Sequence, residues 1–392
     1  MNVKTSALLV AAVLLLSTAA AAESKKAWTF KPDKGFVDDP MAFDAKDAHF
    51  AYVHTDMASF LKVVVIKTAG FKPHKELAIK DTNIKPLQVL FTDDSKRLVL
   101  IFKDARGTRG AMVWDLGKGK LLKRLGPYDR VESVRHKGAQ CLSLTRIRQD
   151  RRGNKHHTVE VLRTANLKRA GRARLTVQAG GTLKRPQMRV RYFERGHLTL
   201  IGTRQGKYDK KRDIRLPDVA IRYDLLTKKE TWKYTPQKLM DWSLTMNTLR
   251  PSNRRSFRFL AVSDDLKKLY YVDRNNALNT ATLPVKWVLY EHTSLKHAET
   301  WDGEKLYFSM TIDPVNKPAV KRKKADIERV DLYRLDAGPK ATPVGKVITG
   351  RKRGETTARR FTWQVGQGYF SYLYKLKGFG RGGSRVTIFK MD

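Results

Sequence analysis

Arginine and lysine are concentrated in several short polar segments that separate apolar runs. In RQDRRGNKHH (148–157), RQGKYDKKRDIR (204–215) and RKRGETTARR (351–360), basic residues outnumber acidic ones by 3, 4 and 4. A guanidinium group presents a planar set of donors that matches the oxygens of a carboxylate or phosphate. The chemistry that these segments predict is therefore the binding of anionic groups.

Motifs for other chemistry are weak. His156 and His157 are adjacent and would point apart on an extended chain, and the other histidines are not grouped with cysteines or carboxylates at metal-ligand spacing. No G-x-S-x-G motif of a nucleophilic serine occurs. The glycine-rich GFGRGG at 378–383 does not join a strand to a helix, so it fails as a dinucleotide motif. We expect neither a metal nor another cofactor.

The composition indicates a folded, strongly basic protein. The 392 residues include 79 Lys and Arg against 38 Asp and Glu, a formal net charge of +41, and 41% are hydrophobic. Such an excess costs compactness through self-repulsion and favours a polyanionic partner over a role in solubility alone. Cys141 is the only cysteine, so an internal disulfide is excluded, and its strand-like surroundings predict a buried, inert thiol.

The N-terminus has the pattern of a secretory signal peptide. Lys4 precedes a ten-residue apolar run at 7–16, and small residues follow at 20–22. The apolar run is too short to span a bilayer. We expect a signal peptide at 1–22 with cleavage after Ala22, and a periplasmic or secreted mature protein that does not span the membrane.

Hairpin-like segments recur along the rest of the chain. Each pairs two apolar runs across a turn of Asp, Gly, Lys or Asn, with turn centres near 45, 94, 137, 195, 265, 303 and 367. Two further strand-like runs follow most hairpins, such as DVAIRYDL (218–225) and ETWKY (230–234). Four antiparallel strands repeated about every 50 residues predict an all-β chain, a seven-bladed β-propeller of four-stranded blades.

The hairpins VSDDLKKLYYV (262–272) and FTDDSKRLVLI (91–101) resemble the repeats of TolB-type and WD-repeat-like propellers, in which the turn Asp and Gly cap the two innermost strands. This resemblance implies a fold and not an activity. We expect one domain at 23–392, closed as a ring by the N-terminal strand in the last blade. The approximate blades are 40–80, 86–125, 131–178, 186–235, 257–290, 297–348, and 359–390 plus 27–31.

In such blades the connections alternate between two rims. Turns within the first and second hairpins lie on one rim, while loops between second and third strands, and between blades, lie on the other. The second group, here named the basic rim, holds the segments 103–110, 148–157, 204–215, 313–326, 351–360 and 377–385, and it is more positive per residue than the opposite rim. The binding residues that we predict are Arg106, Arg109, Arg151, Arg152, Lys184, Arg185, Arg204, Lys210, Lys211, Arg212, Arg254, Arg255, Arg322, Arg351, Arg353 and Arg381.

Asp38-Asp39-Pro40 is similar to the Asp-Pro that opens the first blade in five-bladed propeller glycosidases. That resemblance implies Asp39 as base, with Glu194 or Glu299 as the acid, because such hydrolysis needs two carboxylates. A turn before a strand is the favoured interpretation, so we expect binding rather than catalysis. The expected partner is an acidic polysaccharide, nucleic acid, anionic envelope surface or acidic protein, bound by a monomer. The alternatives are a carbohydrate-active hydrolase and a scaffold in an envelope complex.

Overall fold

The computed structural model describes residues 24–56, 58, 60–81, 83–194, 196–206, 208–209, 211, 214–215, 218–234, 259–262, 268–272, 278–282, 292–298, 306–313, 329–335, 341–348, 360–375 and 384–391. Within these residues the chain forms thirty β-strands and a short 3-10 turn, η1 (Ala69–Phe71), with no α-helix. None of the helical structure in the described part is long and apolar enough to cross a membrane. The proposed signal peptide lies outside the described residues.

Two four-stranded antiparallel sheets begin the described chain after its first strand. The first has the order β2-β3-β4-β5 and the second β6-β7-β8-β9, so each strand pairs with its neighbour in sequence. Their bounds are β2 (Phe36–Phe43), β3 (His49–Thr55), β4 (Leu61–Lys67), β5 (Lys72–Ile79), β6 (Ile84–Phe91), β7 (Arg97–Asp104), β8 (Arg109–Asp115) and β9 (Lys120–Tyr128).

The next two groups of strands form one continuous nine-stranded sheet. Its members are β10 (Arg130–His136), β11 (Ala139–Gln149), β12 (Lys155–Arg163), β13 (Arg169–Val177), β14 (Thr182–Leu183), β15 (Met188–Phe193), β16 (Thr199–Arg204), β19 (Val219–Asp224) and β20 (Glu230–Tyr234). We expected two separate blades here. They are joined because Leu183 in the short β14 pairs with Val177 on one side and with Met188 on the other.

The remaining described strands form smaller sheets. β17 (Tyr208–Asp209) and β18 (Ile214–Arg215) pair, and β21, β22 and β23 form a three-stranded sheet at Phe259–Val262, Lys268–Val272 and Leu278–Thr282. A four-stranded sheet follows, made of β24 (His292–Ala298), β25 (Leu306–Asp313), β26 (Arg329–Leu335) and β27 (Ala341–Ile348).

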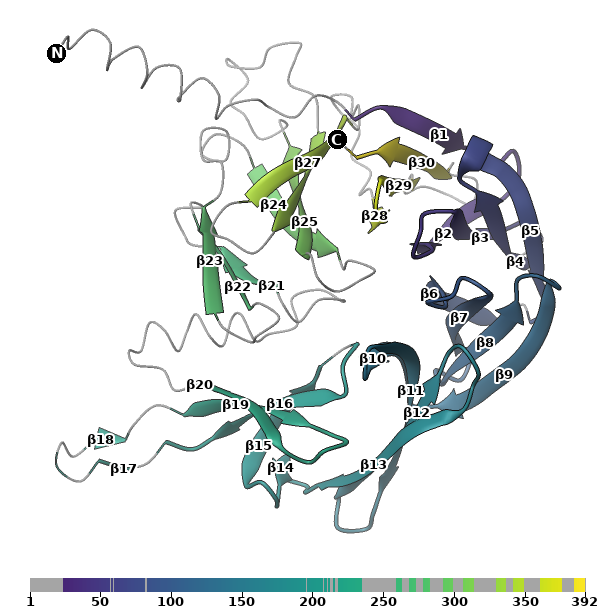
Figure 1. Cartoon of the computed structure of the whole chain (residues 1–392). Coiled ribbons are helices and arrows are strands. Elements are labelled where there is room, and N and C mark those ends of the chain that lie inside the picture. Colours follow the sequence, from purple (N-terminus) through teal and green to yellow (C-terminus); the bar gives the residue numbers. More distant parts are fainter. Residues whose placement is uncertain are drawn as a thin grey trace, which may run out of the picture.

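The last sheet unites the two ends of the described chain, in the order β1-β30-β29-β28. Its strands are β1 (Lys26–Phe30), β28 (Arg360–Val365), β29 (Tyr369–Lys375) and β30 (Ser384–Lys390). Trp28 pairs with Ile388 in an antiparallel register. Figure 1 shows β1 beside β30, next to the sheet that begins with β2.

Apolar residues on both faces of the sheets hold them against one another. In β7, Leu98 and Leu100 pack in a cluster with the first sheet, whereas Val99 and Ile101 pack with residues of β10 and β11. This division follows from the period of two in a strand, which sends successive side chains to opposite faces. Figure 1 shows β2, β6 and β10 nearest the centre of the arc that these sheets form. Four-stranded antiparallel sheets packed in this way form a β-propeller.

Candidate anion-binding surface

A five-residue turn is repeated between the second and third strands of consecutive sheets. At Asp104, the backbone N–H donates to the carbonyl of Thr108 at 2.8 Å, and the side-chain Oδ1 accepts from Thr108 N at 2.8 Å. At Asp150, the same two bonds reach Asn154, at 3.0 and 2.9 Å. A carboxylate that accepts backbone N–H groups fixes the turn without help from the rest of the fold.

The turns present arginine outward. Arg106 and Arg152, the middle residues of the two turns, are exposed. Each is followed by a glycine with positive φ, 86° at Gly107 and 79° at Gly153, a conformation that other residues rarely adopt. A third copy at Asp56 has the same bonds to Phe60, at 3.0 and 2.8 Å, but carries no basic residue. The turn is thus a common scaffold on which the second and third sheets display cations.

Hydrogen bonding keeps the acidic residues of these turns ionised. The Asn154 and His156 side chains hold the pKa of Asp150 at about 2, the largest effect coming from Asn154. The Thr108 hydroxyl, which donates to Oδ2 at 2.6 Å, lowers the pKa of Asp104. The turns therefore keep their geometry over the whole neutral and mildly acidic range.

The turn at 178–182, which joins β13 to β14, lies beside the turn at Asp150. Its Ala179 N–H donates to Asn154 Oδ1 at 3.2 Å, and Gln178 N–H donates to the carbonyl of Thr182 at 2.9 Å, as in the aspartate turns. Lys184 and Arg185 follow this turn directly and are exposed. The two segments, both assigned to the basic rim from sequence, are therefore adjacent.

Acidic residues at the opposite rim join neighbouring sheets. Asp93 accepts from Gln140 N at 2.9 Å and from Arg135 Nη2 at 3.3 Å, which links the turn before β7 to the strands β10 and β11. Asp47 accepts from Gly368 N at 2.6 Å, which links the first sheet to the last, and burial raises the pKa of Asp47. These two carboxylates stabilise contacts between sheets.

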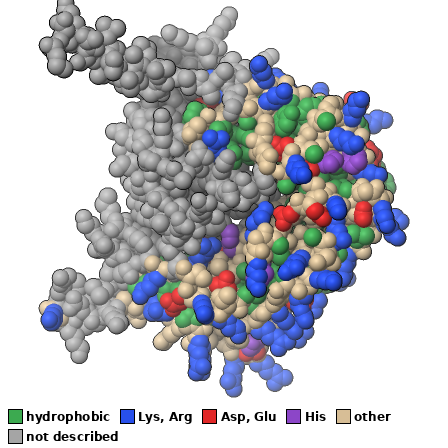
Figure 2. Space-filling view, in the orientation of Figure 1, with side chains coloured by type: hydrophobic (Ala, Val, Ile, Leu, Met, Phe, Trp, Pro, Cys, Tyr) green, Lys and Arg blue, Asp and Glu red, His purple; other side chains and the backbone are tan. Residues whose placement is uncertain are grey.

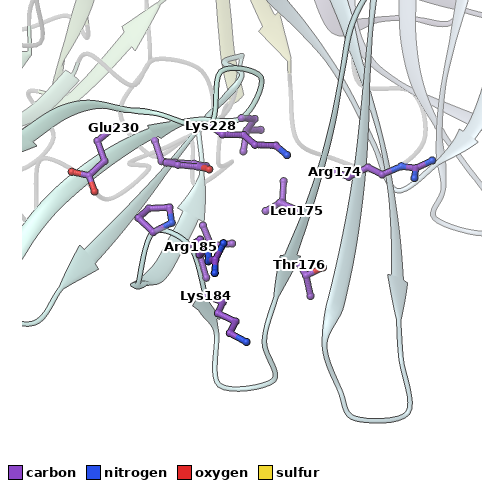
Figure 3. A pocket seen from close by; sticks show the side chains of 11 residues that line it. Arg174, Leu175, Thr176, Lys184, Arg185, Lys228 and Glu230 are labelled. Atoms are coloured by element: carbon purple, nitrogen blue, oxygen red, sulfur yellow. The ribbon is translucent and has the colours of Figure 1, made fainter.

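A groove of about 580 Å³ lies between β13 on one side and, on the other, the segment that joins β14 to β15 and the turn between β19 and β20. Its lining includes four cationic side chains, Arg174, Lys184, Arg185 and Lys228, and a single carboxylate, Glu230. Figure 3 shows Lys184 and Arg185 on one wall, Leu175 and Thr176 facing them from β13, and Lys228 at one end. This groove brings the predicted Lys184 and Arg185 together with Lys228, which was not predicted, whereas the Arg174 guanidinium extends away from them (Figure 3).

A smaller cavity of about 310 Å³ lies between the first two sheets at the opposite rim. The rings of His49 and His74 are 5.1 Å apart there, and His49 Nδ1 lies 2.9 Å from Asp44 Oδ2. Burial, followed by the charges of His49, Lys67 and Lys75, lowers the pKa of His74. Among the described residues, no three side chains are grouped as metal ligands.

The predicted binding residues fall into three groups. Arg106, Arg151, Arg152, Lys184, Arg185 and Lys211 are exposed, and Arg109 is half-buried. Arg204 is also half-buried, and its Nη2 forms an ion pair with Glu230 Oε1. The others lie outside the described residues: Lys210, Arg212, Arg254, Arg255, Arg322, Arg351, Arg353 and Arg381. Figure 2 shows Lys and Arg side chains spread over the visible face of the described half, with fewer acidic ones among them.

The structure describes two of the three carboxylates named for the hydrolase alternative, Asp39 and Glu194. Asp39 is half-buried within β2, where the pairing with β3 is interrupted between Val37 and Met41. Glu194 is buried, and its Oε2 accepts from Arg222 Nε at 2.7 Å and from the Thr199 hydroxyl. These contacts tie Glu194 to the strands β16 and β19 of its own sheet. Glu299 lies outside the described residues.

Sequence reasoning missed the repeated turn and the cations Arg174 and Lys228. An alignment of DARGT (104–108) with DRRGN (150–154) would have shown the turn, because Asp, Arg and Gly occupy the same positions. No comparable signal exists for Arg174 and Lys228. They line the groove only because β13 lies against the turn between β19 and β20.

No family model and no curated protein matches the chain. Solved structures similar to it include a chain of the mitotic checkpoint complex, with a TM-score of 0.44, 11% identity and coverage of 95% of this chain and 94% of that one. Another is the β-propeller domain of the Trilobed protease from Pyrococcus furiosus, with a TM-score of 0.42, 13% identity and coverage of 92% and 96%. A third is the polysaccharide lyase Uly1, with a TM-score of 0.42, 9% identity and coverage of 95% and 100%.

Proposed function

We propose that this chain is an exported, non-catalytic β-propeller that binds an anionic polymer, an envelope surface or an acidic protein partner through its basic rim. The observation that carries the proposal is the repeated aspartate turn, which holds Arg106 and Arg152 outward at equivalent positions of consecutive sheets. Cations at regular positions on a preformed scaffold suit a ligand whose negative charges also repeat.

The exposed rim cations are available to a ligand. Within the described part of the chain, Arg106, Arg151, Arg152, Lys184 and Arg185 form no ion pair with an acidic residue. A polyanion that contacts them releases bound counterions, so the affinity decreases with added salt. The net charge of +41 adds long-range attraction that accelerates the encounter.

The proposal includes a ring of seven blades of the TolB-type or WD-repeat-like kind, closed by β1 in the last blade. The pairing of β1 with β30 supports closure, as does the bond from Val37 N to Ser384 Oγ at 2.6 Å between the first and last sheets. In such a ring the pairing of β1 with β30 joins the first described strand of the chain to the last one. A closed ring also holds the turns of one rim in a fixed arrangement.

Charge reversal on the two rims tests the proposal. We expect Arg106→Glu with Arg152→Glu to elute from heparin resin at clearly lower salt than the wild type. The matched control is Lys46→Glu with Lys96→Glu, which makes the same change in net charge at exposed positions of the opposite rim. The control should elute close to the wild type. Equal losses in both double variants would show that net charge alone drives binding, and no loss in either would refute the proposal.

A further inference from the structure

The groove between β13 and the β14–β15 segment has features of a subsite for one unit of a polymer. We infer that it binds an acidic sugar unit, a uronate or a sulfated sugar, of an acidic polysaccharide. The inference rests on the proposed function, because it assigns a ligand class to a groove that adjoins the basic rim. Three features carry it: the unpaired cations, the apolar floor and the position of the groove next to the rim turns.

The cations of the groove have no anionic partner within the described residues. Arg174, Lys184, Arg185 and Lys228 are exposed, and none of them forms an ion pair there. Glu230, the single carboxylate of the lining, is already paired with Arg204. The groove therefore presents three positive charges, those of Lys184, Arg185 and Lys228, that a bound carboxylate or sulfate can neutralise.

The floor of the groove is apolar. Leu183, Tyr223 and Leu225 are 3%, 6% and 5% exposed, and Leu175 is half-buried above them. A sugar ring combines C–H groups that pack on such a floor with hydroxyl and acidic groups that meet the cations and the Thr176 hydroxyl.

The same floor argues against a nucleic acid. Single-stranded nucleic acids bind by stacking bases on exposed aromatic faces. Tyr223 is the only aromatic residue of the lining, and it is almost fully buried. A phosphate backbone alone would need no apolar floor. The combination of cations and buried aliphatic groups thus favours the acidic sugar.

The groove adjoins the rim turns, so that one polymer can contact both. β13 ends at Val177, and the turn at 178–182 that follows is bonded to the turn at Asp150 through Ala179 and Asn154. Arg151 and Arg152 lie on that second turn and are exposed. A chain seated in the groove would continue toward these arginines.

The test uses a fluorescently labelled hexasaccharide of galacturonate, a neutral hexasaccharide and a labelled 12-nucleotide oligothymidylate. Fluorescence polarisation gives Kd for the wild-type protein and for three variants. These are the double variant Lys184→Gln with Arg185→Gln, the single variant Lys228→Gln, and the control Lys229→Gln. Lys229 is exposed and adjacent to Lys228 but does not line the groove. Thermal unfolding checks that each variant is folded.

We expect the Lys184/Arg185 double variant and Lys228→Gln each to weaken hexagalacturonate binding by about tenfold, as for the loss of a charge-assisted hydrogen bond. Lys229→Gln should stay close to the wild type, oligothymidylate should be less affected, and the neutral sugar should bind weakly throughout. Groove variants with wild-type affinity would overturn the inference. If, in that case, the double variant Arg106→Glu with Arg152→Glu still weakened polyanion binding, the proposed function would stand and only the inference about the groove would fail. Equal losses for both anionic probes would also overturn the inference.

Discussion

The buried imidazole of His157 should make the stability of this protein depend on pH. Its side chain is 4% exposed, and its ring stacks on Phe193 with centroids 4.7 Å apart. Among the described residues, no group hydrogen-bonds its Nδ1. Burial lowers the pKa of His157 from 6.5 to about 4, and the positive charges of Arg130, Lys155 and His156 act in the same direction, against Asp129.

The sign of the effect follows from proton binding. Between pH 6.5 and 4 the unfolded chain binds a proton at this histidine that the folded protein does not bind, so the free energy of unfolding decreases as the pH falls. The difference between pKa values of 6.5 and about 4 corresponds to about 3 kcal/mol when the change is complete. Most of this loss should have occurred by pH 4.5.

The variant His157→Phe should remove this dependence, because phenylalanine keeps an aromatic ring against Phe193 and cannot bind a proton. The free energy of unfolding is measured by urea unfolding at pH 7.5 and at pH 4.5, followed by tryptophan fluorescence. The wild type should lose about 2 to 3 kcal/mol more than the variant between these pH values. His136→Gln, at a histidine whose charge does not act on His157, is the control and should behave like the wild type. Identical pH dependence in His157→Phe and the wild type would refute the reasoning.

Three further predictions concern the framework that holds the rims. Arg222→Leu should lower the free energy of unfolding in urea by about 3 kcal/mol or more, because it removes the ion-pair partner of the buried Glu194 carboxylate. A loss below 1 kcal/mol would contradict a stabilising role for this ion pair. Cys141 is fully buried with a raised pKa, so a thiol reagent should label it only after denaturation, and rapid labelling of the native protein would contradict its burial. Trp28→Ala should lower stability by about 1 to 2 kcal/mol, because the half-buried Trp28 stacks on Phe30 and Phe71. An unchanged melting temperature would show that β1 contributes little.

The strands were predictable because their cause is local. The run RLVLIF at 97–102 is apolar on both faces, which indicates a strand buried between two sheets, and β7 has this position. The run AWTF at 27–30 alternates apolar and polar residues, and it forms the edge strand β1. The buried thiol of Cys141 was predicted for the same reason and is confirmed.

The candidate site was only partly predictable. Lys184 and Arg185 stood out as neighbouring cations in a polar segment, but Lys228 joins them through the packing of β13 against a distant turn. The role of Glu194 could not be predicted from the sequence either. A glutamate near a hairpin turn is compatible with an acid catalyst or with a structural ion pair, and only the contact with Arg222 distinguishes them.

The salt dependence of polyanion binding tests the central claim most directly. The measurement is Kd for a labelled heparin oligosaccharide across a series of salt concentrations, for the wild type and for Arg106→Gln with Arg152→Gln. If the two arginines each contact an anionic group, the double variant should bind more weakly, and the slope of log Kd against log salt should decrease by about 2. An unchanged slope would contradict the claim that the repeated turns form the binding surface.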